Sequence, residues 1–89
     1  MRDLARGVRD GLVRRIGAGG CVLEEVLRGW IRSEVGGYAV HDVLTELVAC
    51  GAVVVDVDAS RVLDGVYYRL DRQELDLWYV AEFLRMEPA

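Results

Sequence analysis

The stretch GGYAVHDVLTELVACGAVVVDVD, residues 36–58, changes its hydrophobic period halfway along and so predicts two different elements. Apolar residues in its first half recur at the spacing of one helix face: Val40, Val43, Leu44, Leu47 and Val48. Gly51 suits the left-handed position that follows many helix C-termini. Val53, Val55 and Val57 then alternate with other residues at the period of a strand. We therefore expect a helix over about 39–50 that turns at Gly51 and leads directly into a strand.

Two further helices are predicted before this stretch. The first covers about 4–16, and its apolar residues recur every four positions: Leu4, Val8, Leu12 and Ile16. Gly7 and Gly11 weaken its middle, because glycine is a poor helix former. The second helix covers about 22–34 and has a similar apolar stripe: Leu23, Val26, Leu27, Trp30 and Ile31. Glycine residues at 17–20 and at 36–37 end the two helices.

A second strand is expected to complete an antiparallel hairpin after the polar connection at 59–61. Its apolar residues alternate with Tyr67 and Arg69: Val66, Tyr68 and Leu70. Tyr67 and Tyr68 therefore point to opposite faces, so that one packs inward and the other is exposed. The register of the hairpin stays open, because residues 62–63 fit either the strand or the loop.

The last helix, over about 72–86, is apolar on nearly all sides. One stripe contains Leu77, Val80, Ala81 and Leu84, with Trp78 beside it, and the other contains Leu75, Tyr79, Phe83 and Met86. Such a helix packs on more than one side. With 53% hydrophobic residues in 89, the chain has more apolar side chains than a small monomer buries. We expect a homodimer with an interface formed by Leu75, Trp78, Tyr79 and Phe83.

Composition favours a single domain over residues 1–89, located in the cytoplasm. Apolar runs stay shorter than the roughly 18 residues of a membrane span, and the charged N-terminus lacks the apolar centre of a secretory signal. Cys21 and Cys50 match no metal or redox spacing, so we expect both to be reduced and packed. Residues 1–32 have a net charge of +3 and residues 33–89 of −7. This gradient fits either a nucleic-acid face or an ordinary solvated surface.

The order of helix, helix, helix, hairpin and helix resembles the winged helix-turn-helix superfamily over about residues 4–70. In VHDVLTELVACGAVVVD, Val40, Leu44, Leu47 and Gly51 match the Val-x-x-x-Leu-x-x-Leu-x-x-x-Gly run of such regulators. The long last helix resembles the dimerising helix of small bacterial regulators, the PadR-like families among them. The resemblance implies an α+β fold with three helices, a two-stranded antiparallel wing and a C-terminal dimerisation helix at 72–86, in a small bacterial or phage-type regulator.

A winged helix binds double-stranded DNA by placing its third helix in the major groove. The resemblance therefore implies a DNA-binding transcriptional regulator, which as a dimer reads half-sites about 34 Å apart. Contacts to bases and phosphates are expected from residues on the second helix, the third helix and the wing: Arg28, Arg32, Tyr38, His41, Thr45 and Arg61.

Asp42 and Glu46 favour a second function, because they occupy exposed positions of the third helix and would face a polyanion. The alternative is a protein-interaction module, an adaptor or inhibitor, whose acidic third helix contacts a basic partner and which does not bind DNA. We expect no enzyme, cofactor or metal site. A single histidine cannot build a metal site alone, and neither cysteine has the neighbouring base that nucleophilic catalysis needs.

Overall fold

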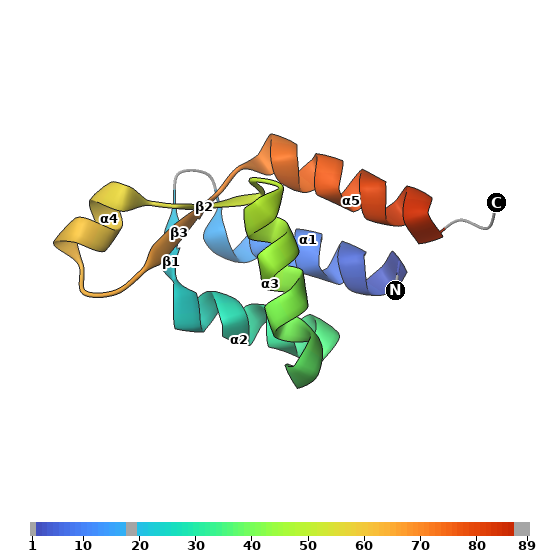
Figure 1. The fold of residues 1–89 in the computed structure, drawn as a ribbon, viewed down its shortest axis with the longest axis horizontal. Coiled ribbons are helices and arrows are strands. Elements are labelled where there is room, and N and C mark those ends of the chain that lie inside the picture. Colours follow the sequence, from blue (N-terminus) through green and yellow to red (C-terminus); the bar gives the residue numbers. More distant parts are fainter. Residues whose placement is uncertain (1, 18–19, 87–89) are drawn as a thin grey trace.

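The computed structural model describes residues 2–17 and 20–86, apart from the side chains of Arg2, Asp3, Tyr38, Phe83, Arg85 and Met86. Within these residues the chain forms five α-helices, one 3₁₀ helix and three strands: α1 (Arg2–Ile16), β1 (Cys21–Leu23), α2 (Glu24–Val35), η1 (Gly37–Ala39), α3 (Val40–Ala49), β2 (Val53–Val55), α4 (Val57–Val62), β3 (Tyr67–Leu70) and α5 (Arg72–Met86). The molecule measures 48 × 26 × 21 Å, with α4 at one end of its long axis (Figure 1). The expected α+β class is confirmed.

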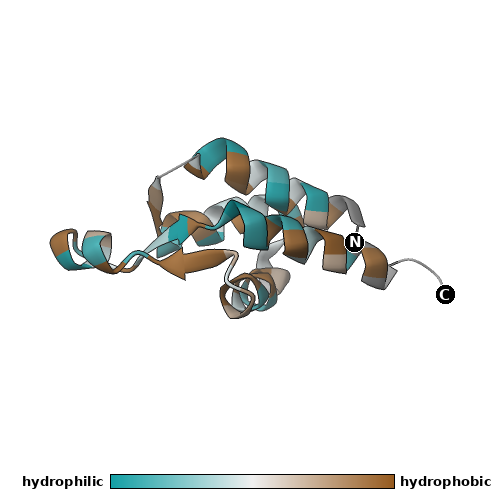
Figure 2. Ribbon diagram, turned by 90° about the horizontal axis from the view of Figure 1, so that it is seen from above, coloured by the Kyte–Doolittle hydropathy of each residue, from teal (hydrophilic) through white to brown (hydrophobic). Residues whose placement is uncertain are grey.

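The core lies where α1, α2, α3 and α5 meet the sheet. Its most deeply buried side chains come from all of these elements: Val8, Leu12, Leu27, Ile31, Leu47, Val53 and Leu75. Figure 2 shows the alternation of hydrophobic and hydrophilic residues along the helices that makes this burial possible. The predicted stripes were wrong at Val26 and Val48, which are each 43% exposed. Val48 lines the open groove between α3 and α2, which leaves its side chain accessible.

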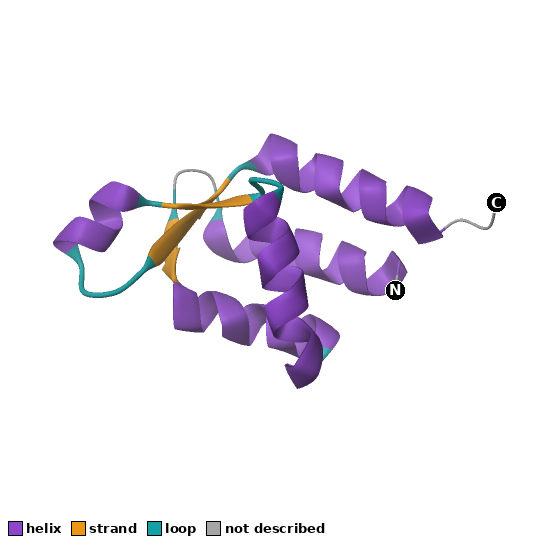
Figure 3. Ribbon diagram, viewed as in Figure 1, coloured by secondary structure: helices purple, strands orange, loops and turns teal. Residues whose placement is uncertain are grey.

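The sheet contains three antiparallel strands in the order β1-β3-β2 (Figure 3). Tyr68 on the central strand pairs with Val22 on one side and with Val55 on the other. The predicted pairing of β2 with β3 is confirmed. The two-stranded wing was an incomplete description, because residues 21–23 form a strand directly before α2 and not the first turn of a helix. The backbone N–H of Glu24 donates to the Val66 carbonyl at 2.9 Å and so extends this pairing.

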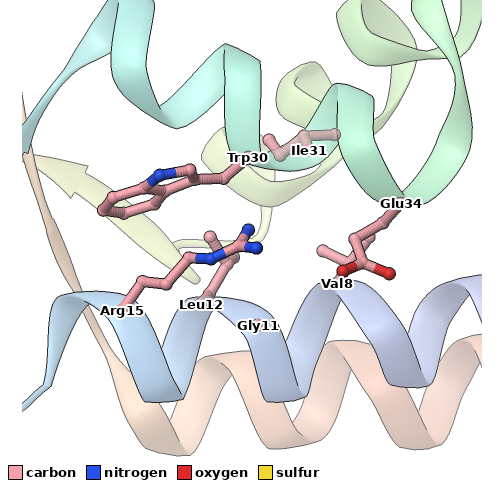
Figure 4. A pocket seen from close by; sticks show the side chains of 7 residues that line it. All are labelled: Val8, Gly11, Leu12, Arg15, Trp30, Ile31 and Glu34. Carbon is pink, nitrogen blue, oxygen red and sulfur yellow. The ribbon is translucent and has the colours of Figure 1, made fainter.

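Glycine in α1 allows a polar side chain of α2 to lie against the helix backbone. A methyl group added at Gly7 would collide with the Glu34 carboxylate, and one added at Gly11 would meet the same carboxylate at 3.6 Å. Figure 4 shows Glu34 and Arg15 beside this junction, where Arg15 lies 5.7 Å from the centre of the Trp30 ring. The side chains here leave no space for a water molecule. These glycines do not break the helix but shape its contact with α2.

The turn between α3 and β2 forms as the opening stretch predicts. Gly51 has a φ of 82°, which is the left-handed conformation that favours glycine. The N–H of Ala52 donates to the Leu47 carbonyl at 2.9 Å and closes the helix end. Ala52 is fully buried, and its carbonyl accepts from the N–H of Asp71 at 2.8 Å. The start of β2 is therefore fixed both to α3 and to the start of α5.

The tip of the hairpin is a short helix, α4, and not the predicted loop. Asp56 begins it, because its carboxylate accepts from the N–H of Ala59 at 3.0 Å. The hydroxyl of Ser60 accepts from the N–H of Tyr67 at 2.8 Å and ties α4 to β3. Val57, predicted to continue the strand, is the first residue of α4 and is 59% exposed. The alternation of valines beyond 55 is therefore not a strand pattern.

Candidate functional site

The exposed residues of α3 divide between two sides of the helix. Asp42 and Glu46 face α1 and α5, where both line a hollow of about 280 Å³ together with Trp78. The indole N–H of Trp78 donates to Glu46 Oε2 at 3.3 Å. Thr45 instead lines a groove of about 310 Å³ together with Arg28 on α2. The two acidic side chains thus lie on the α5 side of α3, and Thr45 lies on the α2 side.

The groove beside Thr45 contains a carboxylate as well as a guanidinium. Arg28 Nη2 lies 3.4 Å from Glu24 Oε1, one helical turn away, and both side chains are about one-third exposed. Tyr68 closes the groove from the sheet. Burial raises the pKa of the Tyr68 hydroxyl above its ordinary value; the nearby Glu24 charge adds to this effect and Arg28 opposes it. The Glu24–Arg28 pair makes the floor of the groove close to neutral.

Predicted DNA-contacting residues are only partly brought together. Arg28 and Thr45 share the groove, and the exposed Arg32 lies one helical turn beyond Arg28 on α2. His41 is exposed and lies one turn before Thr45 on α3. Arg61 is exposed on α4, apart from the others at the end of the molecule (Figure 1). Tyr38 belongs to η1, but its side chain lies outside the described part of the chain.

Sequence reasoning missed Glu24 and Tyr68 as members of this groove. The spacing of Glu24 and Arg28 is visible in the sequence, and it is the spacing of a helical ion pair. Tyr68 could be assigned to one face of the strand or the other, but only its 8% exposure identifies the inward-facing tyrosine. The expectation that one of the two neighbouring tyrosines packs inward is confirmed.

The predicted dimer interface on α5 was wrong for two of its residues. Leu75 is fully buried and Trp78 is 8% exposed, so both belong to the core of one chain. Tyr79 is half-buried, and the Arg9 guanidinium lies 4.1 Å from the centre of its ring. The side chain of Phe83 lies outside the described residues. The physical reason is that α5 packs along α1, which takes up the stripe that the sequence assigned to a second copy.

The opposite stripe of α5 is exposed. Leu77 is 56%, Val80 50% and Leu84 64% exposed, and Ala81 is also exposed. Leu77 and Ala81 line a second groove, of about 430 Å³, between α5 and the C-terminal half of α3. Three glutamates also line it: Glu46, Glu74 and Glu82. Residues of α3 therefore border this groove, the groove beside Thr45 and the hollow next to Asp42.

Comparison with protein-family models, with curated proteins and with solved structures gave no match. In the described part of the chain, no helix is both long enough and apolar enough to cross a bilayer. Among the same residues, no three metal-binding side chains lie together. Both cysteines are free thiols, and both are exposed, so the expectation that they are packed was wrong.

Proposed function

We propose that this chain is a winged helix-turn-helix domain that binds double-stranded DNA as a transcriptional regulator. In this proposal, α3 enters the major groove with the side that carries His41 and Thr45. The β2–β3 hairpin with α4 is the wing, and Arg61 at its end contacts the DNA backbone. The order of three helices followed by a projecting antiparallel hairpin supports this assignment.

The observation that carries the proposal is the division of α3 into two sides. Asp42 and Glu46 argue against DNA binding only if they face the phosphates. Both line the hollow next to Trp78, whereas Thr45 shares a groove with Arg28. A helix that enters a groove with its Thr45 side therefore has the two carboxylates on the side that faces α1 and α5. The proposal concerns one protomer. It does not include the predicted dimer interface on α5, because Leu75 and Trp78 lie in the core.

Phosphate contacts come from Arg28, Arg32 and Arg61 in this arrangement. Each neutralised phosphate contributes a slope of about −0.9 to the dependence of log K on log salt. Three contacts give a slope of about −2.7 per protomer, so affinity for random duplex falls about 40-fold between about 50 and 200 mM salt. Thr45 and His41 supply base contacts, which set sequence preference and add little to this slope.

Fluorescence anisotropy with labelled random duplex DNA tests the proposal across this salt range. Arg28→Ala and Arg32→Ala should each weaken binding to every sequence and reduce the salt slope by about 0.9. Thr45→Ala should leave the slope unchanged and alter the preferred sequence in a selection from a random pool.

Arg72→Ala is the matched control for Arg28→Ala. Arg72 lies 3.2 Å from Asp76 in a helical ion pair of the same spacing, but it is located on α5. It should therefore keep the wild-type slope. Absence of binding even at low salt, or an equal loss in Arg72→Ala and Arg28→Ala, would contradict DNA binding by this face.

A further inference from the structure

A second surface of α3 has chemistry that DNA binding does not use. We define the acidic groove as the recess of about 430 Å³ between α3 and α5 whose apolar lining includes Leu77, Trp78 and Ala81. Glu46 on α3 and Glu74 and Glu82 on α5 also line it. The acidic groove lies on the α5 side of α3, and its lining includes neither Thr45 nor Arg28, although Ala49 borders both this recess and the groove beside Thr45.

The apolar part of this surface extends beyond the recess. Leu77 and Ala81 continue on the outer side of α5 into Val80 and Leu84, which are at least half exposed. Packing of α5 on α1 buries other residues of α5, among them Leu75, so the fold of one chain leaves Leu77, Val80, Ala81 and Leu84 exposed. An apolar strip next to a recess is the shape that accepts one face of an amphipathic helix.

Charge decides which kind of helix fits. Among the side chains that the structure describes, those that line the acidic groove include three glutamates and no arginine, and Asp42 lies one turn before Glu46 on α3. A partner with arginine or lysine beside its apolar face would be attracted to this rim. A second copy of this chain on the same surface would bring another set of the same glutamates together, which is unfavourable.

We propose that the acidic groove binds an amphipathic helical segment of another protein, with leucine-like residues on one face and arginine or lysine at its flanks. The apolar face covers Leu77 and Ala81, and the basic residues approach Glu74 and Glu82. Binding here requires no DNA and does not depend on the proposed DNA-binding function. It gives the domain a docking site for a basic partner on the α5 side of α3.

Two cysteines allow a direct test on the full chain. Cys50 lines the acidic groove, and Cys21 lies on β1, outside it; both are exposed thiols. The probe is a designed leucine–arginine helix about four turns long, with a leucine–glutamate helix of the same pattern as its control. The leucine–arginine helix should slow alkylation of Cys50 severalfold and leave the alkylation rate of Cys21 unchanged, as measured by mass spectrometry. The leucine–glutamate helix should protect neither thiol.

Variants separate the contributions of shape and charge. Ala81→Arg places a long cation on the apolar lining and should abolish protection of Cys50. Glu74→Gln and Glu82→Gln should each weaken binding of the leucine–arginine helix about two- to fivefold, since single exposed charge pairs contribute this much. Val62→Arg is the control, because Val62 is 83% exposed on α4 and remote from the groove. Circular dichroism verifies that each variant is folded.

Three results would overturn the proposal. The first is equal alkylation of Cys50 with and without the leucine–arginine helix. The second is protection that persists in Ala81→Arg. The third is protection of Cys50 that grows with protein concentration in the absence of peptide, together with a dimer in light scattering, which would assign the groove to a second copy of this chain. Loss of DNA binding in Arg28→Ala affects none of these readouts, so the two proposals fail separately.

Discussion

Tyr68 connects the sheet, the core and the proposed DNA face. Its ring is 8% exposed, and its hydroxyl lies near Glu24 and Arg28. Burial, reinforced by the Glu24 charge, raises the pKa of this hydroxyl above its ordinary value of 10.0. The folded state therefore holds the phenolic proton more tightly than the unfolded state. This contribution to stability is fully present below about pH 10 and is lost as the pH rises through the folded pKa.

We expect the urea midpoint of the wild type to fall steeply above about pH 10, and that of Tyr68→Phe to fall less. At neutral pH the substitution should cost about 1 kcal/mol or less, because it removes one hydroxyl that lies near the Glu24 carboxylate. Tyr67→Phe is the matched control: Tyr67 is the next residue on β3 and is only half-buried, so this variant should keep the steep alkaline fall. A Tyr68→Phe profile parallel to the wild type would contradict the assignment.

Single residues also mark the limit of what the sequence can predict. The periodic spacing correctly identified most buried positions, including Leu27, Leu44 and Leu47. It also showed that one of two adjacent tyrosines faces inward, but not which one, because the face that a strand buries depends on its partners. In the same way, the sequence placed Asp42 and Glu46 on the surface of α3. Which neighbour they face is set by the packing of α5, an element that begins more than twenty residues later.

At the scale of elements, the long helices and the strands β2 and β3 were predicted, whereas β1 and α4 were not. Two of the three residues of β1 were assigned to the start of the following helix, and none of the six residues of α4 is buried, so α4 has no apolar face that a periodic pattern could indicate. Hydrogen bonds to two side chains stabilise α4. Asp56 accepts from the N–H of Ala59, and Ser60 accepts from the N–H of Tyr67. Asp, Ser and Gly residues between two strands predict a loop, but the same residue types are also common at the first position of a helix. The sequence pattern alone does not distinguish these two possibilities.

We expect Asp56→Ala to unfold α4 locally and leave the rest of the chain folded. Loss of a helix-capping carboxylate costs about 1 kcal/mol, which is large for a helix of six residues. Hydrogen exchange should speed up several-fold at the amides of residues 59–63 and remain unchanged in α3. Asp58→Ala is the matched control, because Asp58 is exposed in the first turn of α4 and is not the capping residue. Equal acceleration in both variants would mean that capping by Asp56 does not maintain α4.

At the scale of the whole molecule, the two proposals divide its charge between two sides of α3. The chain has a net charge of −4, and three glutamates lie in the acidic groove, so the overall field opposes a polyanion while Arg28 and Arg32 attract it locally. The balance between this overall repulsion and the local attraction depends on salt concentration, because salt screens the field of distant charges. The Debye length is about 30 Å at about 0.01 M salt, comparable with the 26 Å intermediate dimension of the molecule, and about 8 Å at about 0.15 M.

Removing charge from the acidic groove should therefore strengthen DNA binding only at low salt. We expect the double variant Glu74→Gln/Glu82→Gln to bind random duplex about two- to fivefold more tightly than the wild type at about 0.01 M salt. At about 0.15 M the two proteins should bind equally, because the field of the groove no longer reaches the Thr45 side. Fluorescence anisotropy at both salt concentrations gives the comparison. A gain that persists at the higher concentration would mean that these carboxylates lie against the duplex, and the proposed orientation of α3 would have to be reversed.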